Sequence, residues 1–296
     1  MKFGYLTGNH HGGIDPGDLA QELEERGFAS VWYPEHTHIP TSRESPYPNG
    51  GQLPGTYFHM MDPFVSIGVA AARTSQITLG TGICLILQHD LIDLARTIAS
   101  ADVLASGRVV LGVGVGWNSE ELADHRPDMP FSRRYGAMRE RIAAMRSIWA
   151  DDPVPAFEGE WDSYGESWIY PKPTNGTVPI ALGNAGPLGI QHAAAEYADE
   201  WAPIDVGVMN TTGKPDVLGG IERFRRLADE AGRENAHDIP ITLYIWGRPR
   251  MDRLESYAEA GVSQFILTPV NFDLPSADET LQYLDELAPT LAAFDN

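Results

Sequence analysis

Two kinds of hydrophobic pattern alternate along the chain. Short runs rich in β-branched residues, typical of buried strands, are followed by longer segments whose apolar positions recur with the spacing of an amphipathic helix. The short runs predict strands at Phe3–Thr7, Ser30–Tyr33, Ile77–Ile83, Val109–Val113, Pro179–Leu182, Glu200–Ile204, Ile241–Ile245 and Gln264–Leu267. The longer segments predict helices at Pro16–Arg26, Pro63–Thr74, Leu91–Ala105, Ser132–Ala150, Leu188–Ala198, Val217–Ala231, Met251–Ala260 and Ala277–Ala292. This alternation predicts a parallel sheet covered by helices.

Eight such units in 296 residues fit a single (β/α)8 barrel domain, residues 1–296, because these barrels need about 250 residues plus insertions. An open, doubly wound sheet is the competing architecture. Two segments exceed ordinary loop length, at about 39–61 and 151–177. The first follows the second strand, on the side where barrel active sites form. The second is rich in aromatic residues that could fold over the barrel mouth, cover a helix or form a subunit contact.

The charge balance excludes several classes of function. The chain has 21 Lys and Arg against 41 Asp and Glu, a formal net charge of −20, which repels phosphate backbones and anionic lipid surfaces. We therefore expect no nucleic-acid or membrane partner. A single cysteine, Cys84, excludes an internal disulfide and a zinc site built from several thiolates. Neither a signal peptide nor a run of about 18 apolar residues is evident, so we expect a soluble, cytoplasmic protein.

The sharpest signal for chemistry is the run WYPEHTHIP at residues 32–40, directly after the second predicted strand. Glu35 beside His36 at the carboxyl end of a strand is a plausible acid–base pair, since a neighbouring charge tunes histidine near neutral pH. His36 and His38 point the same way in an extended chain, which would also suit a metal ion. A lone histidine is usually structural, but three polar residues clustered at a barrel mouth, Glu35, His36 and His38, favour function.

Glycines gather at the ends of three further predicted strands. Gly80 and Gly82 end the third strand, where glycine marks a bulge, the close approach of a ligand, or curvature of the barrel. In GVGVGW, residues 112–117, alternating glycines leave either a flat wall suited to a planar ring or room for tight packing. Their spacing does not match the dinucleotide fingerprint. The turn GNAG, residues 183–186, offers backbone N–H groups to an anion, although such turns are common.

Together these segments resemble the bacterial luciferase-like monooxygenase superfamily, and most closely its branch of coenzyme F420-dependent oxidoreductases. The resemblance covers essentially the whole chain. Its most specific strings occur in the family's order: SVWYPEHTHIP, LGTGICLILQHD, GRVVLGVGVGWNSEE, ALGNAGP and YADEW. The resemblance implies a (β/α)8 TIM barrel with insertion regions that binds a deazaflavin or a flavin at the carboxyl ends of its strands. It also implies a homodimer, which is common in the family.

The resemblance further implies roles for single residues. Glu35 and His36 would lie near the reactive face of the ring, and Gly82 and Ile83 would form a strand bulge with a non-prolyl cis peptide bond. The cofactor-binding positions that it implies are Gly82, Ile83, Val115, Trp117, Gly183, Asn184, Ala185 and Gly186, the last four as the turn that receives the cofactor phosphate. The sugar-phosphate dehydrogenase branch, however, has a catalytic glutamate where this chain has Trp117, and it has a tryptophan shortly after the histidine. Because this chain departs at both positions, the substrate stays open.

We expect an oxidoreductase that transfers a hydride between coenzyme F420 and a small organic substrate, with His36, held by Glu35, giving or taking a proton. A flavin mononucleotide (FMN)-dependent monooxygenase is the first alternative. A metal-dependent barrel hydrolase with His36 and His38 as ligands is the second, but the eighth strand ends in FILTP, without a further ligand. We therefore expect no metal. The basic residues to examine for the anionic tail of the cofactor are Arg43, Arg73, Lys172 and Lys214.

Overall fold

Parallel strands form the centre of the molecule. The computed structural model describes residues 1–48, 50–195, 197–210 and 212–294, and in this part of the chain the barrel strands are β1 (Lys2–Leu6), β2 (Ser30–Tyr33), β3 (Thr78–Thr81), β4 (Val109–Val113), β7 (Ile180–Leu182), β8 (Glu200–Trp201), β9 (Thr242–Ile245) and β10 (Gln264–Leu267). They pair in the order β8-β7-β4-β3-β2-β1-β10-β9. Parallel bridges from Trp201 to Ile241 and from Ile204 to Tyr244 join β8 to β9. The predicted (β/α)8 TIM barrel is confirmed, and the open sheet is wrong.

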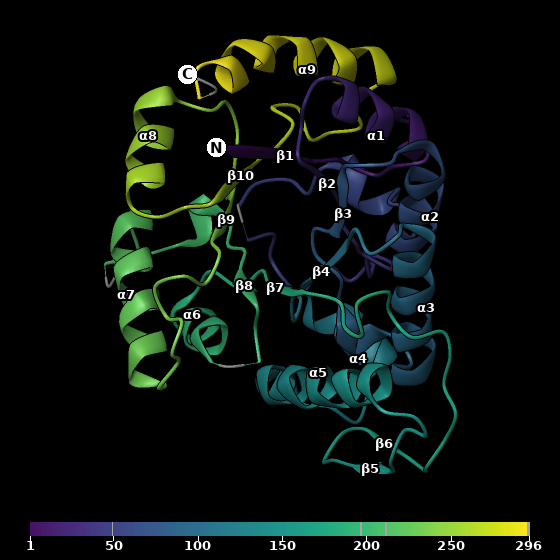
Figure 1. Cartoon of the computed structure of the whole chain (residues 1–296). Coiled ribbons are helices and arrows are strands. Elements are labelled where there is room, and N and C mark those ends of the chain that lie inside the picture. Colours follow the sequence, from purple (N-terminus) through teal and green to yellow (C-terminus); the bar gives the residue numbers. More distant parts are fainter. Residues whose placement is uncertain (49, 196, 211, 295–296) are drawn as a thin grey trace.

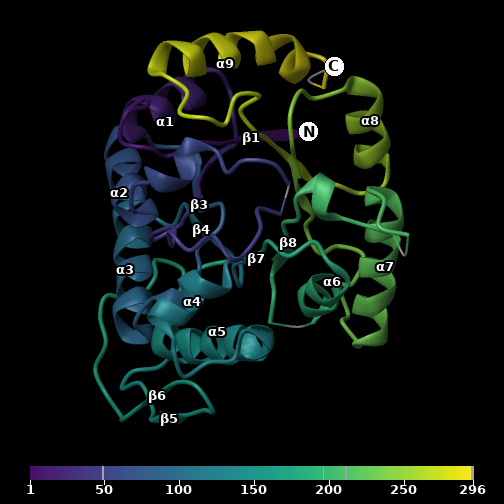
Figure 2. The same cartoon turned by 180° about the vertical axis from the view of Figure 1, so that it is seen from behind.

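Helices surround the barrel, as Figure 1 shows from one end and Figure 2 from behind. The predicted helices are observed as α1 (Pro16–Glu25), α2 (Pro63–Arg73), α3 (Leu91–Leu104), α5 (Arg134–Ala150), α6 (Pro187–Ala194), α7 (Val217–Glu230), α8 (Met251–Glu259) and α9 (Ala277–Ala292). Asp62 caps α2 by accepting hydrogen bonds from the N–H groups of Phe64 and Val65. Helix α6 ends before the predicted Ala198 because Ala195 is extended; Glu196 lies outside the described residues.

Side chains of each strand alternate between two hydrophobic layers. In β2, Val31 and Tyr33 belong to the large core between the strands and the helices, whereas Trp32 points into the barrel. The barrel interior is a separate cluster made of Leu6, Trp32, Ala181, Ala202, Tyr244, Ile266 and Phe272. Because this cluster fills the barrel, any ligand must bind at its carboxyl end rather than pass through it.

Two short elements were not predicted. Helix α4 (Ser119–His125) follows β4, and its cap, Asn118, accepts a hydrogen bond from the N–H of Glu121. The hairpin β5 (Phe157–Glu158) to β6 (Ser163–Tyr164) lies in the second long segment, outside α5 (Figure 1). The hydroxyl of Tyr164 donates to the carbonyl of Ala144 in α5 at 3.3 Å. This part of the segment therefore covers a helix, which was one of the open interpretations.

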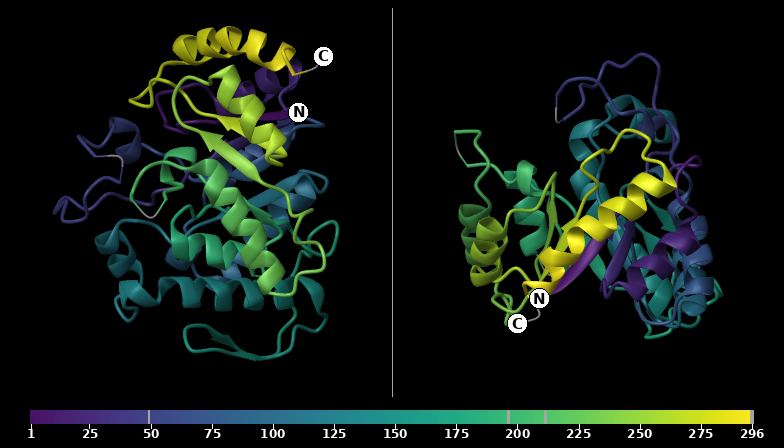
Figure 3. Two further views of the ribbon diagram at one scale, coloured as in Figure 1. Left: turned by 90° about the vertical axis from the view of Figure 1, so that its left-hand side faces the viewer. Right: turned by 90° about the horizontal axis from the view of Figure 1, so that it is seen from above.

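The first long segment crosses the barrel mouth. Figure 3 shows it projecting from the end opposite the N-terminus. Its first half is held by α4, where Glu120 accepts hydrogen bonds from the N–H groups of Glu44 and Ser45. Its second half contains the 3₁₀ helix η1 (Gly55–Phe58), where the Thr56 hydroxyl donates to the carbonyl of Phe272 at 2.6 Å. The segment is thus fixed to both sides of the mouth.

None of the helices formed by the described residues combines the length and the apolar character that a membrane crossing requires.

Candidate active site

A pocket of about 200 Å³ opens at the carboxyl ends of the barrel strands. It is lined by Leu6, Pro34, Glu35, His36, Tyr57, Met60, Gly82, Ile83, Leu85, Gly116, Trp117, Gly183, Ala202, Ile204, Tyr244, Trp246 and Phe272. The structure therefore brings together six of the predicted site residues from four strand ends. The exceptions are Val115, which packs into the outer core, and Asn184, Ala185 and Gly186, which continue the turn beyond Gly183.

A bulge in the backbone forms one wall of this pocket. Strand β3 ends at Thr81, before the predicted Ile83, and the Gly82–Ile83 peptide bond is cis. That predicted bond is confirmed. The chain then rejoins β4, where the N–H of Cys84 donates to the carbonyl of Gly112 at 2.7 Å and the N–H of Gly114 donates to the carbonyl of Cys84 at 3.1 Å. The bulge is therefore hydrogen-bonded to β4 on both sides of Cys84.

The glycines of β4 and of the following strand make room for this bulge. A Cβ atom on Gly114 would lie 1.9 Å from Cδ1 of Ile83, and one on Gly183 would lie 2.5 Å from its Cγ2. A Cβ atom on Gly112 would lie 1.9 Å from the carbonyl oxygen of Thr81. The interpretation of alternating glycines as a flat wall for a ring is wrong at these positions. Tight packing explains them: Gly114 and Gly183 accommodate the side chain of Ile83, and Gly112 accommodates the carbonyl group of Thr81.

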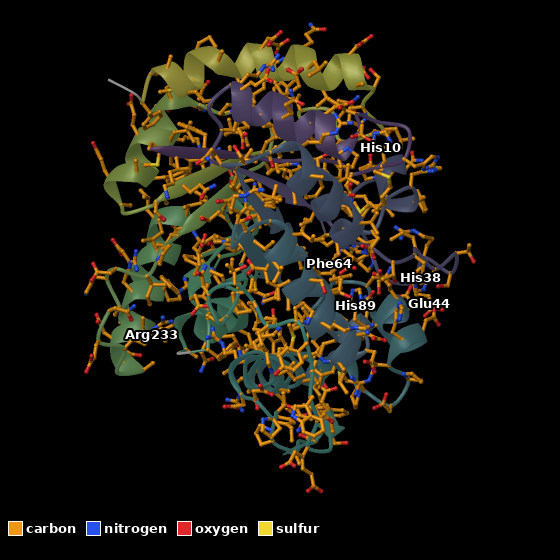
Figure 4. All side chains as sticks on the ribbon, turned by 45° about the vertical axis from the view of Figure 1, so that its right-hand side comes forward. His10, His38, Glu44, Phe64, His89 and Arg233 are labelled. Atoms are coloured by element: carbon orange, nitrogen blue, oxygen red, sulfur yellow. The ribbon has the colours of Figure 1, made fainter. Side chains whose placement is uncertain are left out.

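Glu35 faces away from His36. Its carboxylate accepts hydrogen bonds from the N–H of Leu85 at 2.7 Å and from Nε2 of His89 at 2.8 Å. The ring of Phe64 meets His89 edge-on, with centroids 6.2 Å apart, and Figure 4 shows these two side chains as neighbours. The expected contact between Glu35 and His36 is wrong, because consecutive residues of an extended segment project to opposite sides.

The Glu35–His89 contact shifts both groups toward their charged forms. Burial alone would raise the pKa of Glu35, but the hydrogen bond and charge of His89, with the Leu85 N–H and the Cys84 thiol, outweigh it and lower that pKa. Burial alone would lower the pKa of His89, and the hydrogen bond and charge of Glu35 outweigh it and raise that pKa. The buried carboxylate of Glu35 and the half-buried imidazole of His89 therefore form an ion pair behind the bulge.

His36 is held by a residue that the sequence analysis missed. Its Nδ1 lies 2.8 Å from Oε2 of Glu121, whose side chain is fully buried at the start of α4. Oε1 of Glu121 accepts a hydrogen bond from the N–H of Thr37 at 3.1 Å. Because a carboxylate only accepts, Nδ1 of His36 donates, and Nε2 is the nitrogen left to give or take a proton. The acidic run after the third glycine cluster, Ser119-Glu120-Glu121, was the available signal.

Aromatic residues surround His36. We define the aromatic wall as Tyr47, Tyr57, Trp117, Trp246 and Phe272, which come from the four segments that follow β2, β4, β9 and β10. The imidazole lies 5.2 Å from the ring centroid of Tyr57 and 5.6 Å from that of Trp117. Tyr57 continues to Phe272 at 5.8 Å, and Phe272 to Trp246 at 5.5 Å. The wall keeps the acid–base group beside a largely apolar space.

Two unpaired polar atoms at this site suit a bound molecule. The hydroxyl of Tyr244, in the pocket floor, and the side-chain nitrogen of Asn184 are buried and have no hydrogen-bond partner among the described residues. The Nε1–H of Trp201 fixes the turn by donating to the carbonyl of Asn184 at 3.0 Å. Helix α6 starts directly after this turn, and no side chain caps it. The turn can therefore receive an anionic group, and the pocket a ring with polar edges.

The histidines considered as metal ligands have different partners. Nε2 of His38 lies 2.9 Å from Asp124 at the protein surface, whereas His36 binds Glu121 (Figure 4 labels His38). Within the described residues, the group that could hold a metal ion is Glu35, Cys84 and His89. Both carboxylate oxygens of Glu35 already accept hydrogen bonds there. The shared site of His36 and His38 is wrong.

A second, outer cleft of about 560 Å³ lies behind the Glu35–His89 pair. Glu35 lines the pocket, and His89 lines the outer cleft together with His125. Across the cleft, Arg141 forms a buried ion pair with Asp162 and donates to the carbonyls of Ile86 and His89. The Glu35–His89 pair therefore lies between the pocket and the outer cleft.

Comparison with known proteins places the chain among oxidoreductases. A family model described as luciferase-like monooxygenase matches residues 1–290. An uncharacterized protein of Mycobacterium tuberculosis (strain ATCC 25618 / H37Rv) is 36% identical over 297 residues, covering 99% of each chain. The F420-dependent glucose-6-phosphate dehydrogenase of Amycolatopsis mediterranei (strain U-32) is 30% identical over 250 residues, covering 83% of this chain and 68% of that protein. A solved F420-dependent secondary alcohol dehydrogenase, in complex with an F420-acetone adduct, has a TM-score of 0.71 at 20% identity, over 96% of this chain and 98% of that one.

Proposed function

Because this chain belongs to the luciferase-like monooxygenase family and is an oxidoreductase, we propose that it transfers a hydride between coenzyme F420 and a small organic substrate. The observation that carries the proposal is His36, whose imidazole lines the pocket while buried Glu121 holds its Nδ1. A relative named as F420-dependent, aligned over most of this chain, supports the choice of cofactor.

The proposal assigns a task to each part of the site. When bound, the deazaflavin supplies the carbon that accepts or donates the hydride. The turn at 183–186, with the unpaired amide of Asn184, would hold its anionic part, and Ile83 and Tyr244 would contact its ring. Nε2 of His36 exchanges a proton with the substrate oxygen, and Glu121 fixes the tautomer and stabilises the charged imidazole.

Glu35 has no contact with the reacting proton in this scheme. It binds the N–H of Leu85 just after the bulge and so keeps Ile83 in place.

The four basic residues considered for the cofactor tail fall into two groups. Arg73 pairs with Asp18, and Lys172 donates to backbone carbonyls behind α5, so neither serves the mouth. Arg43 and Lys214 belong to segments that follow β2 and β8, and they are the two to test.

The second candidate is an FMN-dependent monooxygenase; the family description supports the monooxygenase part, and a similar fold has been solved with FMN. Both ring systems fit a pocket with apolar walls and an anion-receiving turn. The test is titration of the purified apoprotein with F420 and with FMN, in which the absorbance of each cofactor reports its binding. We expect stoichiometric F420 binding and FMN binding at least 10-fold weaker. Asn184→Ala should weaken F420 binding about 10-fold, while Asn175→Ala, on an exposed turn, should leave it unchanged. Stoichiometric FMN binding without measurable F420 binding would reject the proposal.

A further inference from the structure

The pocket offers no free charge to a substrate. Among its described lining residues there is neither lysine nor arginine, and the groups that can carry charge near neutral pH are Glu35 and His36. Glu35 is neutralised by His89, and His36 is bonded to Glu121. Burial raises the pKa of Tyr57 and of Tyr244, so both phenols stay neutral. A charged group that entered this space would lose its hydration without gaining an ionic partner.

The remaining surface of the pocket selects for apolar bodies. The aromatic wall runs from Trp117 and Tyr57 to Phe272 and Trp246, and Met60, Leu85 and Ile204 fill the spaces between these rings. Flat aromatic faces favour ring-shaped ligands through stacked or edge-on contacts. They also attract cations, but Glu35 and Glu121 are already bound to histidines, and Asp205, which accepts a hydrogen bond from the N–H of Trp246, lies 3.6 Å from Arg253. A cation would therefore meet no unpaired carboxylate among these three.

We propose that the substrate is an uncharged, largely apolar molecule with an aromatic or alicyclic ring, whose alcohol or carbonyl oxygen faces His36. This inference rests on the proposed function for the role of His36 and names the class of substrate. It distinguishes this chain from the F420-dependent glucose-6-phosphate dehydrogenase to which it is similar, because glucose 6-phosphate carries a charged phosphate. The position of Trp117, where that branch has a glutamate, belongs to the same apolar surface.

Binding of matched probes tests the substrate class without turnover. Acetophenone, benzoate, phenyltrimethylammonium and glucose 6-phosphate would be titrated into the protein with saturating F420, and binding followed by calorimetry and by quenching of tryptophan fluorescence. Trp117 and Trp246, two of the seven tryptophans, line the pocket and respond directly to a bound probe. We expect acetophenone to bind at least 10-fold more tightly than benzoate or phenyltrimethylammonium, and glucose 6-phosphate to show no saturable binding.

Two neighbouring residues of η1 provide a matched control. Tyr57 contacts His36 and Phe272 in the pocket, whereas the side chain of Phe58 is 53% exposed. Tyr57→Ala should weaken acetophenone binding about 10-fold, Tyr57→Phe should restore most of it, and Phe58→Ala should change nothing. Circular dichroism and the melting temperature show whether each variant is folded.

Three results would overturn this inference. They are binding of benzoate or glucose 6-phosphate as tight as that of acetophenone, tighter binding of phenyltrimethylammonium, and equal effects of Tyr57→Ala and Phe58→Ala. The proposed function fails independently of these results. If F420 does not bind while acetophenone is still preferred, the cofactor assignment is lost and the substrate class remains. If F420 binds and charged probes are preferred, the substrate class is lost and the cofactor assignment remains.

Discussion

Two acid–histidine pairs start from adjacent residues of one loop and serve different sides of the barrel wall. Glu35 pairs with His89 behind the bulge, and His36 pairs with Glu121 at the pocket. Both contacts measure 2.8 Å, and both carboxylates are buried. They differ in which side chain of the pair lines the pocket. In the first pair it is the acid, already satisfied by a backbone N–H, and in the second it is the imidazole.

The difference shows that composition and distance do not decide whether such a pair is catalytic. The Glu35–His89 pair connects the loop after β2 to the segment after the bulge, and Arg141 fixes that segment by donating to the carbonyl of His89 at 2.6 Å. It acts as a brace. In the His36–Glu121 pair, Nε2 of His36 has no partner among the described residues, and the imidazole lines the pocket beside the aromatic wall. Proton transfer to or from a substrate requires such a free nitrogen.

The largest effect should distinguish the two histidines. His36→Ala should lower turnover by roughly 10²–10⁴-fold and leave F420 affinity nearly intact, because it removes the group that carries the proton and leaves the contacts to the deazaflavin ring in place. His89→Ala should act chiefly on stability. The measurement is turnover with F420 and an uncharged aryl alcohol, with F420 affinity titrated separately. If His36→Ala weakens F420 binding and the bound fraction still turns over, His36 supports the ring and is not the acid or base.

Removal of the bracing acid should cost folding free energy. Glu35→Ala leaves His89 and the N–H of Leu85 unpaired inside the protein, and we expect a loss of about 3 kcal/mol. Asp124→Ala is the matched control, because Asp124 pairs with His38 at the surface, where its side chain is 65% exposed. That change should cost less than about 1 kcal/mol. Urea unfolding followed by circular dichroism measures both, and equal losses would contradict the distinction between the two sites.

The barrel was predictable because its signals are local. Apolar runs and helical periodicity determine the eight barrel strands and the helices predicted around them segment by segment, and Asp62-Pro63 marks the start of α2. The cis bond at Gly82–Ile83 came from resemblance alone, since no pattern of polarity indicates it.

The partner of His36 was not predictable, because Glu121 lies 85 residues further along the chain. Its short helix, α4, has seven residues, too few for a clear hydrophobic period. The glycines at 112 and 114 allowed two interpretations, and only the positions of the Thr81 carbonyl and the Ile83 side chain distinguish a flat wall from close packing. Chemistry here depends on pairings between distant segments, and sequence periodicity carries no information about those.

Close packing around the bulge predicts a specific loss and its repair. Gly114→Ala places Cβ against Cδ1 of Ile83, so we expect the bulge to shift, stability to fall by about 1–3 kcal/mol and F420 affinity to fall about 10-fold. Ile83→Val lacks that Cδ1 atom and should restore much of the affinity in the double variant. Gly136→Ala, in α5 with open space around it, should be neutral or slightly stabilising. A Gly114→Ala protein with unchanged F420 affinity would show that the bulge does not support the ring.

The smallest effect is the pH dependence of the brace. The pKa of Glu35 is lowered from its ordinary 4.5, so its stabilisation is present above about pH 4.5 and is lost as pH falls through the lowered value. The pKa of His89 is raised from 6.5, so its stabilisation is complete below about pH 6.5 and is lost as pH rises through the raised value. The difference in unfolding free energy between the unmodified protein and His89→Gln should therefore be largest between about pH 4.5 and 6.5.

His125, which lines the same outer cleft, provides the opposite sign. Burial, with the charge of His38 nearby, lowers its pKa, so protonation destabilises the fold and the penalty disappears as pH rises to about 6.5. His125→Gln should therefore gain stability relative to the unmodified protein only on the acidic side, where His89→Gln loses it. Urea unfolding at intervals from pH 4 to pH 8 measures both differences. Parallel curves for the two variants would mean that Glu35 does not hold His89 in its charged form, and the pair would then be a neutral hydrogen bond rather than an ionic brace.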